Sequence, residues 1–292
     1  MKKSTKIIAV VLTLVLATGI FAACGKKAND EKQPEAPAKK TVKVIDVNLT
    51  EEQYAFGVDK NQPELLEKVN AAIKEMKENG EMEAIFNNYF GDGTPVPVAS
   101  AELDTSKDQF VVATNAEFKP FEYTEGDKFV GIDMEIAAAL AKKFGQELVI
   151  QHMDFDAVCL SVQQHKCDIA MAALTINEER KASVEFTDSY YQASQKLIVP
   201  STETKFDACK TADEVLAVLQ GMDASTKVGF QTGTTGQGYT SNEGDYATNA
   251  LKVTPVGYNS AALAVQDVLN GNLTYVVTDA APADAIVKAI NG

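Results

Sequence analysis

The chain has 292 residues, 45% of them hydrophobic, and 27 basic residues against 41 acidic ones give a formal net charge of −14. Because nucleic-acid binding needs a basic face for the phosphates, this balance excludes a nucleic-acid partner. The two histidines and four cysteines show no metal-ligand spacing, so we expect no metal and no other cofactor.

The first residues describe an export signal. Three lysines precede position 7, an uncharged run covers 7–23, and small residues lead into Cys24. We therefore expect residues 1–23 to be a secretory signal peptide. The alternative is a retained membrane anchor, because the run approaches the length of a spanning helix. The small-small-Cys ending resembles a bacterial lipobox, which implies that Cys24 is acylated and anchors the protein outside the cytoplasmic membrane.

Residues 24–41 are expected to be a flexible tether, because no large apolar side chain lies between 25 and 40. Three cysteines follow the tether, and an odd count outside the cell means at least one free thiol or an intermolecular bridge. Cys159 and Cys167 lie in an apolar stretch and are expected to be small core residues, whereas Cys209 is given no role.

The segment before position 100 reads as two strands, at 42–47 and 54–58, followed by two helices. The first helix opens at Pro63 and ends at Gly80, and the second covers 82–89. A Pro/Ser/Asp-rich stretch at 94–108 reads as a linker. The alternative is that the two strands and two helices before this linker form a separate small domain, but about 50 residues make a poor independent core.

The rest of the chain alternates between strand-like and helix-like segments. Helices are predicted at 131–144, 155–164 and 260–271, and strands at 110–114, 147–151, 168–172, 195–199, 227–230, 253–256 and 275–278. This alternation predicts an α/β fold with parallel sheets covered on both faces. Ligands of such sheets bind beyond the carboxyl ends of the strands.

Several blocks in this part resemble the extracytoplasmic polar amino acid-binding proteins of ABC importers, solute-binding protein family 3. They are TNAEFKPFEY at 114–123, FVGIDMEIAAALAKKFG at 129–145, MDFDAV at 153–158, DIAMAALTINEERKASVEFTDSYY at 168–191, VGFQTGTTGQGY at 228–239 and YVVTDAAPAD at 275–284. The resemblance implies a two-lobe periplasmic-binding-protein fold of type II.

The order of the blocks differs from the family in one respect. The final strand, the return crossover and the last two helices of the family resemble residues 42–93, which stand in front here. We interpret this as a circular permutation, which is tolerated where natural termini lie close together. The first lobe is then expected at 52–198, with 94–108 as the permutation linker. The second lobe is expected to combine 42–51 with 199–292.

Within the resemblance, Arg180 stands where the family grips the ligand carboxylate, and a guanidinium can bond both oxygens. The alternative is a surface ion pair with a neighbouring glutamate. Asp279 follows an apolar strand and is expected to accept the ligand ammonium, with a helix N-cap as the alternative or additional role. Thr234 and Thr235 belong to a Gly-Thr-Thr-Gly loop that is expected to bind the carboxylate, although an ordinary turn would look the same.

The resemblance also implies contacts from six further residues. Thr175 and the backbone of Ala173 are expected beside Arg180. Aromatic walls and side-chain contacts are expected from Phe118, Phe155, Asn115 and Gln231. Several relatives have Asp at the position of Asn115, and an amide cannot neutralise a buried cation, so we expect a neutral polar ligand.

The predicted protein is a monomeric, non-enzymatic lipoprotein that closes on one free amino acid and delivers it to a permease and its ATPase subunit. Two rivals are a dehydratase-type enzyme on the same fold and a sensory ligand-binding protein. The cleft blocks contain no histidine, which disfavours the enzyme.

Overall fold

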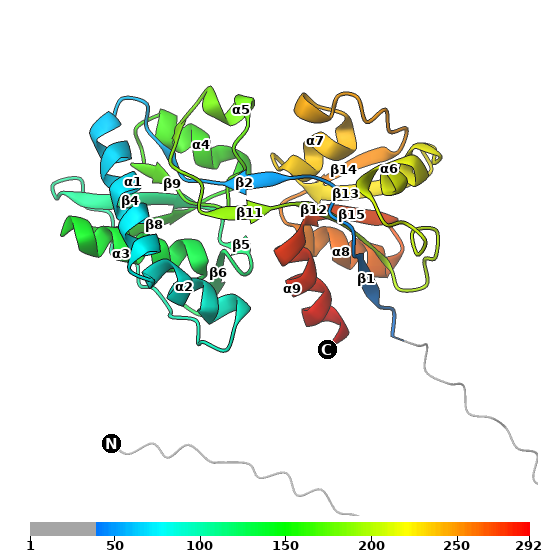
Figure 1. Cartoon of the computed structure of the whole chain (residues 1–292), viewed down its shortest axis with the longest axis horizontal. Coiled ribbons are helices and arrows are strands. Elements are labelled where there is room, and N and C mark those ends of the chain that lie inside the picture. The colour runs from blue at the N-terminus through cyan, green and yellow to red at the C-terminus, as the bar shows by residue number, and fades with distance from the viewer. Residues whose placement is uncertain (1–38) are drawn as a thin grey trace, which may run out of the picture. The chain divides into compact units, whose positions relative to one another are not determined.

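The computed structural model describes residues 39–292. The predicted signal peptide at 1–23, Cys24 and all but the last residues of the predicted tether lie outside the described residues. Between 39 and 292, no helix is long and apolar enough to cross a bilayer. The described chain forms two lobes, each built on its own five-stranded sheet, joined by a pair of crossing strands (Figure 1).

The first lobe is built around a sheet whose strands run in the order β10, β3, β9, β4, β8. These strands are β10 (Glu185–Phe186), β3 (Gly57–Val58), β9 (Ile169–Ala170), β4 (Gln109–Thr114) and β8 (Glu147–His152). The strand β4 is parallel to both of its neighbours, β8 and β9, whereas β3 is antiparallel to both β9 and β10. A small antiparallel sheet of β5 (Glu117–Phe118), β6 (Glu122–Glu125) and β7 (Lys128–Val130) adjoins it.

Helices cover both faces of this sheet. One core cluster contains buried residues of α1 (Pro63–Glu78), α2 (Glu81–Phe90) and α3 (Ile132–Phe144), and α4 (Phe155–Gln163) packs into a cluster on the opposite face. The helix α1 begins with a proline at its first turn, where the missing N–H has no cost, and buries Val69, Ile73 and Met76 at helical spacing. The residues before position 100 therefore supply part of the first lobe's core.

The second lobe has a sheet in the order β1, β12, β15, β13, β14. The strands are β1 (Val42–Ile45), β12 (Gln195–Pro200), β15 (Tyr275–Asp279), β13 (Lys227–Gln231) and β14 (Thr254–Tyr258). On one face pack α6 (Ala212–Gln220) and α7 (Thr235–Ser241), and on the other pack α8 (Ala261–Asn270) and α9 (Ala280–Asn291). A short 3-10 turn, η1 (Gly244–Tyr246), follows α7.

Two short strands cross between the lobes. The strands β2 (Glu52–Tyr54) and β11 (Tyr191–Ala193) pair antiparallel, with Tyr54 opposite Tyr191. In Figure 1 they form a narrow ribbon that spans the space between the two larger sheets. Such a two-strand crossing is a suitable hinge, because a few residues can absorb a rotation of one lobe against the other.

Several sequence predictions need correction. The sheets are mixed rather than parallel, because β12 is antiparallel to both β1 and β15. The strand predicted at 54–58 splits into β2 and β3, since the chain changes from the hinge ribbon to the first-lobe sheet there. The stretch 94–108 has no helix and no strand, yet Val98 is buried and pairs with Phe129, so one part of it packs on the lobe.

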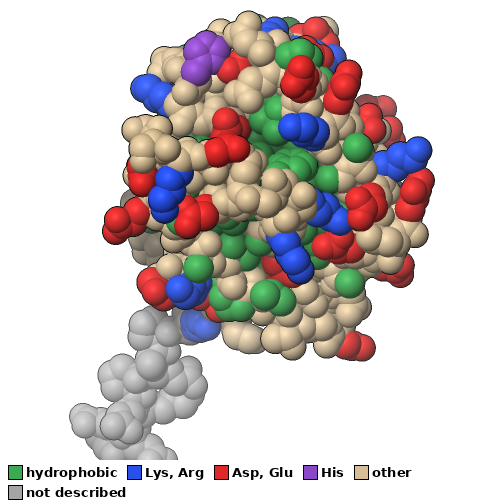
Figure 2. Space-filling model, turned by 90° about the vertical axis from the view of Figure 1, so that its left-hand side faces the viewer, with side chains coloured by type: hydrophobic (Ala, Val, Ile, Leu, Met, Phe, Trp, Pro, Cys, Tyr) green, Lys and Arg blue, Asp and Glu red, His purple; other side chains and the backbone are tan. Residues whose placement is uncertain are grey.

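The outer face of the first lobe carries acidic and basic side chains interspersed, around a hollow in which hydrophobic side chains are visible (Figure 2). No continuous basic surface appears on this face of the described residues, which agrees with the charge balance of the whole chain.

Candidate functional site

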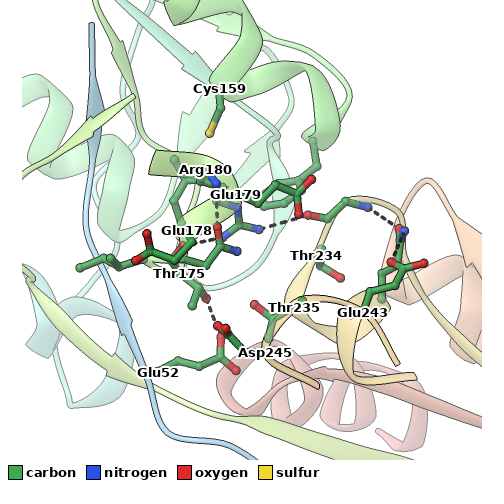
Figure 3. Close-up of a pocket in the computed structure, with 18 of the residues that line it drawn as sticks. Glu52, Cys159, Thr175, Glu178, Glu179, Arg180, Thr234, Thr235, Glu243 and Asp245 are labelled. Carbon is green, nitrogen blue, oxygen red and sulfur yellow. Dashed lines mark hydrogen bonds between the residues drawn. The ribbon is translucent and has the colours of Figure 1, made fainter. Parts of the chain in front are cut away.

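A cavity of about 580 Å³ opens between the lobes. Its walls come from α4 and the segment 174–183 of the first lobe, from the hinge strand β2, and from residues 233–246 of the second lobe. Figure 3 shows Arg180 on one side of this cavity facing Thr234 and Thr235 on the other. The volume suits a small molecule of amino-acid size.

Arg180 is the one basic residue among the described residues that line this cavity. It lies in the short helix α5 (Glu178–Lys181), whose N-cap Asn177 accepts a hydrogen bond from the Arg180 backbone N–H at 2.8 Å. One guanidinium nitrogen donates to the backbone oxygen of Thr175 at 2.8 Å, and another donates to that of Gly233 in the opposite lobe at 3.1 Å. The guanidinium also lies 5.1 Å from the centre of the Phe155 ring. These contacts fix it between the lobes.

The Gly-Thr-Thr-Gly loop connects β13 to α7. Gly233 has φ of 79° and lies against Asp156, where an added Cβ would come within 3.0 Å of the Asp156 Cβ, so glycine permits the close approach of the lobes. Thr234 is the N-cap residue of α7, and its hydroxyl donates to the backbone oxygen of Gln231 at 2.7 Å. Thr235 begins the helix and lines the cavity.

The structure brings half of the predicted site residues to the cavity wall. These are Phe155, Thr175, Arg180, Thr234 and Thr235. The other half lie outside its lining: Asn115, Phe118, Ala173, Gln231 and Asp279. Cys159, expected to be a core residue, is half-buried and lines the cavity, whereas Cys167 is buried as expected; both are unpaired, as is Cys209.

Asn115 and Gln231 contact each other across the lobes. The Gln231 side-chain amide donates to the Asn115 oxygen at 2.9 Å, and Asn115 donates to the backbone oxygen of Met153 at 2.8 Å. Both residues are 3% exposed. In the described form their side chains therefore join one lobe to the other.

Phe118 and Ala173 lie in the core of the first lobe. Phe118 is buried in the small sheet, where it pairs with Glu122. Ala173 has φ of 48°, and its N–H donates to Asp133 at 2.9 Å. Burial raises the pKa of Asp133 to about 7. Burial, followed by the charges of Asp133 and Asp279, raises the pKa of Glu122 well above its usual range.

Asp279 ends β15 and is the N-cap residue of α9, but its side chain makes no capping hydrogen bond. It is 6% exposed and accepts a very short hydrogen bond from the hydroxyl of Tyr54. Burial, followed by the negative charge of Glu52, raises the pKa of Asp279 to about 7. Its carboxyl group thus connects the second lobe to the hinge strand.

Sequence reasoning missed Glu52. This residue lies on β2, is 7% exposed and lines the cavity. Its carboxylate accepts hydrogen bonds from the Thr50 hydroxyl and the Thr175 hydroxyl, each at 2.5 Å, and from the Gln195 amide at 3.1 Å. Strand alternation in the sequence could have revealed it. Residues two apart on a strand lie on the same face, so Glu52 shares a face with the aromatic Tyr54.

The cavity is strongly acidic. Among the described residues that line it, Arg180 is the one basic residue, against seven acidic ones: Glu51, Glu52, Asp156, Glu178, Glu179, Glu243 and Asp245. Acidic side chains come from both lobes and the hinge, so the potential inside the cavity favours cations despite the guanidinium.

Comparisons with known proteins place the chain among solute-binding proteins. The chain is 36% identical over 137 residues to the arginine-binding extracellular protein ArtP of Bacillus subtilis, covering 44% of this chain and 53% of that protein. It is 30% identical over 184 residues to a probable histidine-binding protein of Neisseria gonorrhoeae, covering 61% of each. The chain thus spans about half to two thirds of the length of these relatives.

Solved structures show the same two-lobe architecture. An ancestral arginine-binding protein bound to arginine superposes with a TM-score of 0.54 at 33% identity, covering 64% of this chain and 76% of that one. The arginine-bound, truncated ArgBP from T. maritima gives a TM-score of 0.51 at 30% identity, covering 62% and 78%. The fold is therefore the α/β two-lobe periplasmic-binding-protein fold of type II, as the sequence predicted.

A family model described as bacterial extracellular solute-binding proteins, family 3, matches residues 2–92 and 110–288. This family binds solutes and is not enzymatic, which agrees with the expectation of a non-catalytic protein outside the cell. The match covers most of the chain, and the protein belongs to this family.

Proposed function

We propose that the protein captures a free amino acid between its lobes as the binding component of an ABC importer. The observation that carries this proposal is the position of Arg180, whose guanidinium lies in the cavity between the lobes and faces Thr234 and Thr235 (Figure 3). A planar guanidinium can bond both oxygens of a carboxylate, and the Thr235 hydroxyl can complete the contact from the second lobe, since that of Thr234 already donates to the Gln231 oxygen.

The acidic lining supports a cationic ligand, with L-arginine as the leading candidate. Seven carboxylates around the cavity attract a cation, and the relatives from Bacillus subtilis and Neisseria gonorrhoeae are named for arginine and histidine binding. This replaces the neutral polar ligand expected from Asn115. That expectation took Asn115 as a contact of the ligand side chain, whereas its amide is bonded to Gln231 and Met153.

A thermal-shift screen against the twenty amino acids tests both the proposal that the protein binds an amino acid and the proposal that this amino acid is cationic. A ligand bound only by the folded protein at a hundred times its dissociation constant adds about 2.7 kcal/mol of stability. We expect L-arginine to give the largest increase in melting temperature, with neutral amino acids below it. A larger shift with a neutral amino acid would remove the cationic assignment, and no shift with any amino acid would remove the amino-acid proposal.

Binding is proposed to proceed by hinge closure around β2 and β11. The contacts that join the lobes in the described form include hydrogen bonds from Arg180 to the Gly233 oxygen and from Gln231 to Asn115. A ligand that contacts both lobes has a higher affinity for the closed form and shifts the population toward it. The closed form would then dock on a permease, and an ATPase subunit would supply the energy for release of the ligand. In the alternative sensory role, the same closure would be recognised by another partner protein.

The chain is also proposed to be circularly permuted relative to its family. The expected boundary between 198 and 199 needs correction, because β12 (Gln195–Pro200) is a strand of the second-lobe sheet; the proposed lobes are therefore 52–194 and 42–51 plus 195–292. In support, β1 pairs with β12 in the second-lobe sheet, while α1 and α2 supply the first-lobe core. The Asn291 side chain accepts from the Val42 N–H at 3.4 Å and donates to the Val42 oxygen at 2.8 Å, so the two segments to be joined meet.

A rearranged chain tests the permutation. Residues 109–292 are placed first and linked through a few glycines to residues 42–93. If the permutation is correct, this chain has the family's order and binds the ligand of the original protein with the same affinity within about threefold. An unfolded or non-binding product, from a linker length that spans the gap, would contradict it.

The membrane anchor is the remaining part of the proposal. Lipidation of Cys24 would hold the protein at the membrane surface without a spanning segment. Metabolic labelling with a radioactive fatty acid should mark the wild-type protein and leave a Cys24→Ala variant unlabelled. Label in the variant would contradict the assignment.

A further inference from the structure

Asp133 is a buried carboxylate that lies outside the cavity lining. It stands in the first turn of α3 and is 0% exposed. Its two oxygens accept hydrogen bonds from two different segments, one from the Ala173 N–H at 2.9 Å and the other from the Tyr190 hydroxyl at 2.6 Å. Because burial of a carboxylate opposes folding, its position is better explained by what these two bonds hold in place.

The first bond holds a strained backbone. Ala173 has φ of 48°, in the left-handed region that residues with a side chain rarely adopt. For an alanine, this conformation costs an energy that corresponds to roughly fivefold to 30-fold in an equilibrium constant. Ala173 is also buried, so its N–H would lose a needed acceptor without the carboxylate. We therefore expect the backbone at this residue to relax if the carboxylate is removed.

The strained residue begins the segment that forms one wall of the cavity. Leu174 and Thr175 follow it and line the cavity, and the Thr175 oxygen accepts from the Arg180 guanidinium at 2.8 Å (Figure 3). Beyond them, the Ile176 N–H donates to the oxygen of Gln53 on β2 at 3.0 Å. The segment is thus held by the hinge strand at its far end and by the buried carboxylate at its near end.

The second bond reaches the start of the other hinge strand. Tyr190 directly precedes β11, and its ring stacks on that of Phe56 with the ring centres 4.4 Å apart. Its N–H donates to the Tyr54 oxygen at 2.9 Å. One carboxylate therefore fixes the cavity wall relative to the residue from which the hinge ribbon leaves the first lobe.

We propose that Asp133 is a positioning residue for ligand binding, which holds the strained backbone of Ala173 in place. The held segment presents Thr175, and Thr175 in turn fixes the guanidinium of Arg180. Asp133 thus acts on the ligand without touching it. This inference rests on the proposed function, because it concerns the same cavity.

The test measures the effect of Asp133→Ala in two chains, the wild type and a chain that carries Ala173→Gly. Glycine adopts a positive φ without strain, so the second chain no longer needs the carboxylate to hold this backbone. The matched control is Asp168→Ala in the same lobe, whose carboxylate accepts from the Val111 N–H at 2.8 Å but is not part of the cavity lining. Titration calorimetry gives the affinity for L-arginine, and urea unfolding gives the stability. Where the screen finds a better amino acid, that amino acid is the probe.

We expect Asp133→Ala to weaken binding of L-arginine by roughly fivefold to 30-fold in the wild-type chain, the range set by the strain of a left-handed alanine. In the chain with Ala173→Gly, the same change should weaken binding by less than about threefold. Asp168→Ala should lower the stability but change the affinity by less than about threefold. An equal loss of affinity in both chains, a comparable loss with Asp168→Ala, or no loss in the wild-type chain would overturn the inference. If the wild type binds no amino acid, the proposed function itself fails, and this is known before any variant is compared.

A measurement on the wild-type protein covers a failure of Asp133→Ala to fold. Hydrogen exchange followed by nuclear magnetic resonance reports directly on the Ala173 amide. We expect this amide to be protected from exchange, because its N–H is bonded to a buried acceptor, and to be more protected when L-arginine is bound. An Ala173 amide that exchanges as in an unfolded chain, or whose exchange rate L-arginine leaves unchanged, would overturn the inference.

Discussion

Replacement of Arg180 by alanine should remove most of the affinity for an amino acid. The side chain donates two hydrogen bonds to backbone oxygens, at 2.8 Å to Thr175 and at 3.1 Å to Gly233. In the proposed complex it also holds the ligand carboxylate. Without it, that carboxylate would be enclosed between the lobes with no cationic partner.

The magnitude follows from the burial of this pair. Removing one partner of a buried ion pair costs roughly 3–5 kcal/mol. A factor of ten in affinity corresponds to about 1.4 kcal/mol, so the dissociation constant should rise by roughly 150-fold to 4,000-fold. The stability of the ligand-free protein should change by less than about 1 kcal/mol, because α5 is short and Arg180 lies at a half-buried edge.

Titration calorimetry with L-arginine measures the loss of affinity, and urea unfolding measures the change in the stability of the ligand-free protein. The matched control is Lys181→Ala on the same helix. The Lys181 side chain is 47% exposed, and its ammonium pairs with Glu178 at 2.7 Å. Since an exposed pair contributes little, this control should bind as the wild type does. An Arg180→Ala protein that is folded and binds within about threefold of wild type would refute the assigned role.

The hydrogen bond between Asn115 and Gln231 should stabilise the closed form. A double-mutant cycle with each residue changed to alanine should therefore give a coupling energy of about 1 kcal/mol in the free energy of ligand binding. If the losses of binding free energy in the two single variants simply add in the double variant, the prediction is wrong. The pKa of Asp279, raised to about 7 by burial and a neighbouring carboxylate, means that the acid is largely neutral at pH 6 and ionised at pH 8. Asp279 interacts electrostatically with the cavity residues Glu52 and Arg180, so affinity for a cationic ligand should fall from pH 8 to pH 6 as this negative charge is lost. The ligand-free protein should lose stability as the pH rises from about 4 to 7, and an affinity that is the same at pH 6 and pH 8 would contradict this. Gly131→Ala should destabilise the protein by more than about 3 kcal/mol in urea unfolding, because φ is 136° and the new Cβ would lie 2.0 Å from a backbone oxygen. At Gly126, with φ of 63° and no atom within 4 Å, the same change should cost about 1 kcal/mol, and equal effects would contradict the steric argument.

Much of the fold could be predicted because its periodic segments are long. The helix from Pro63 and the helix after Gly131 have clear apolar faces and clear ends, and both are confirmed. Strand direction was not predictable, because short strand-like runs such as 195–199 look the same in parallel and antiparallel pairs. The short strand β10 was missed, since two residues carry no period, and β3 was predicted only as part of one longer strand at 54–58.

The site was predictable only in part. Motif resemblance located Arg180 and Thr175, which the fold brings to one cavity. It could not reveal that Asn115 is bonded to Gln231, because the two are far apart in sequence and meet only when the lobes touch. Glu52 was missed for a related reason, since a glutamate in a polar run reads as solvent-exposed until the partners of its strand are known.

The pairing of β1 with β12 affects how the chain is made. Val42 leaves the ribosome early, but its ladder partner Pro200 follows only after the whole first lobe. An apolar strand therefore stays unpaired during most of synthesis and export, and contacts this distant in sequence form late. Since unpaired strand edges promote aggregation, the nascent protein should depend on chaperone protection until its last third has emerged.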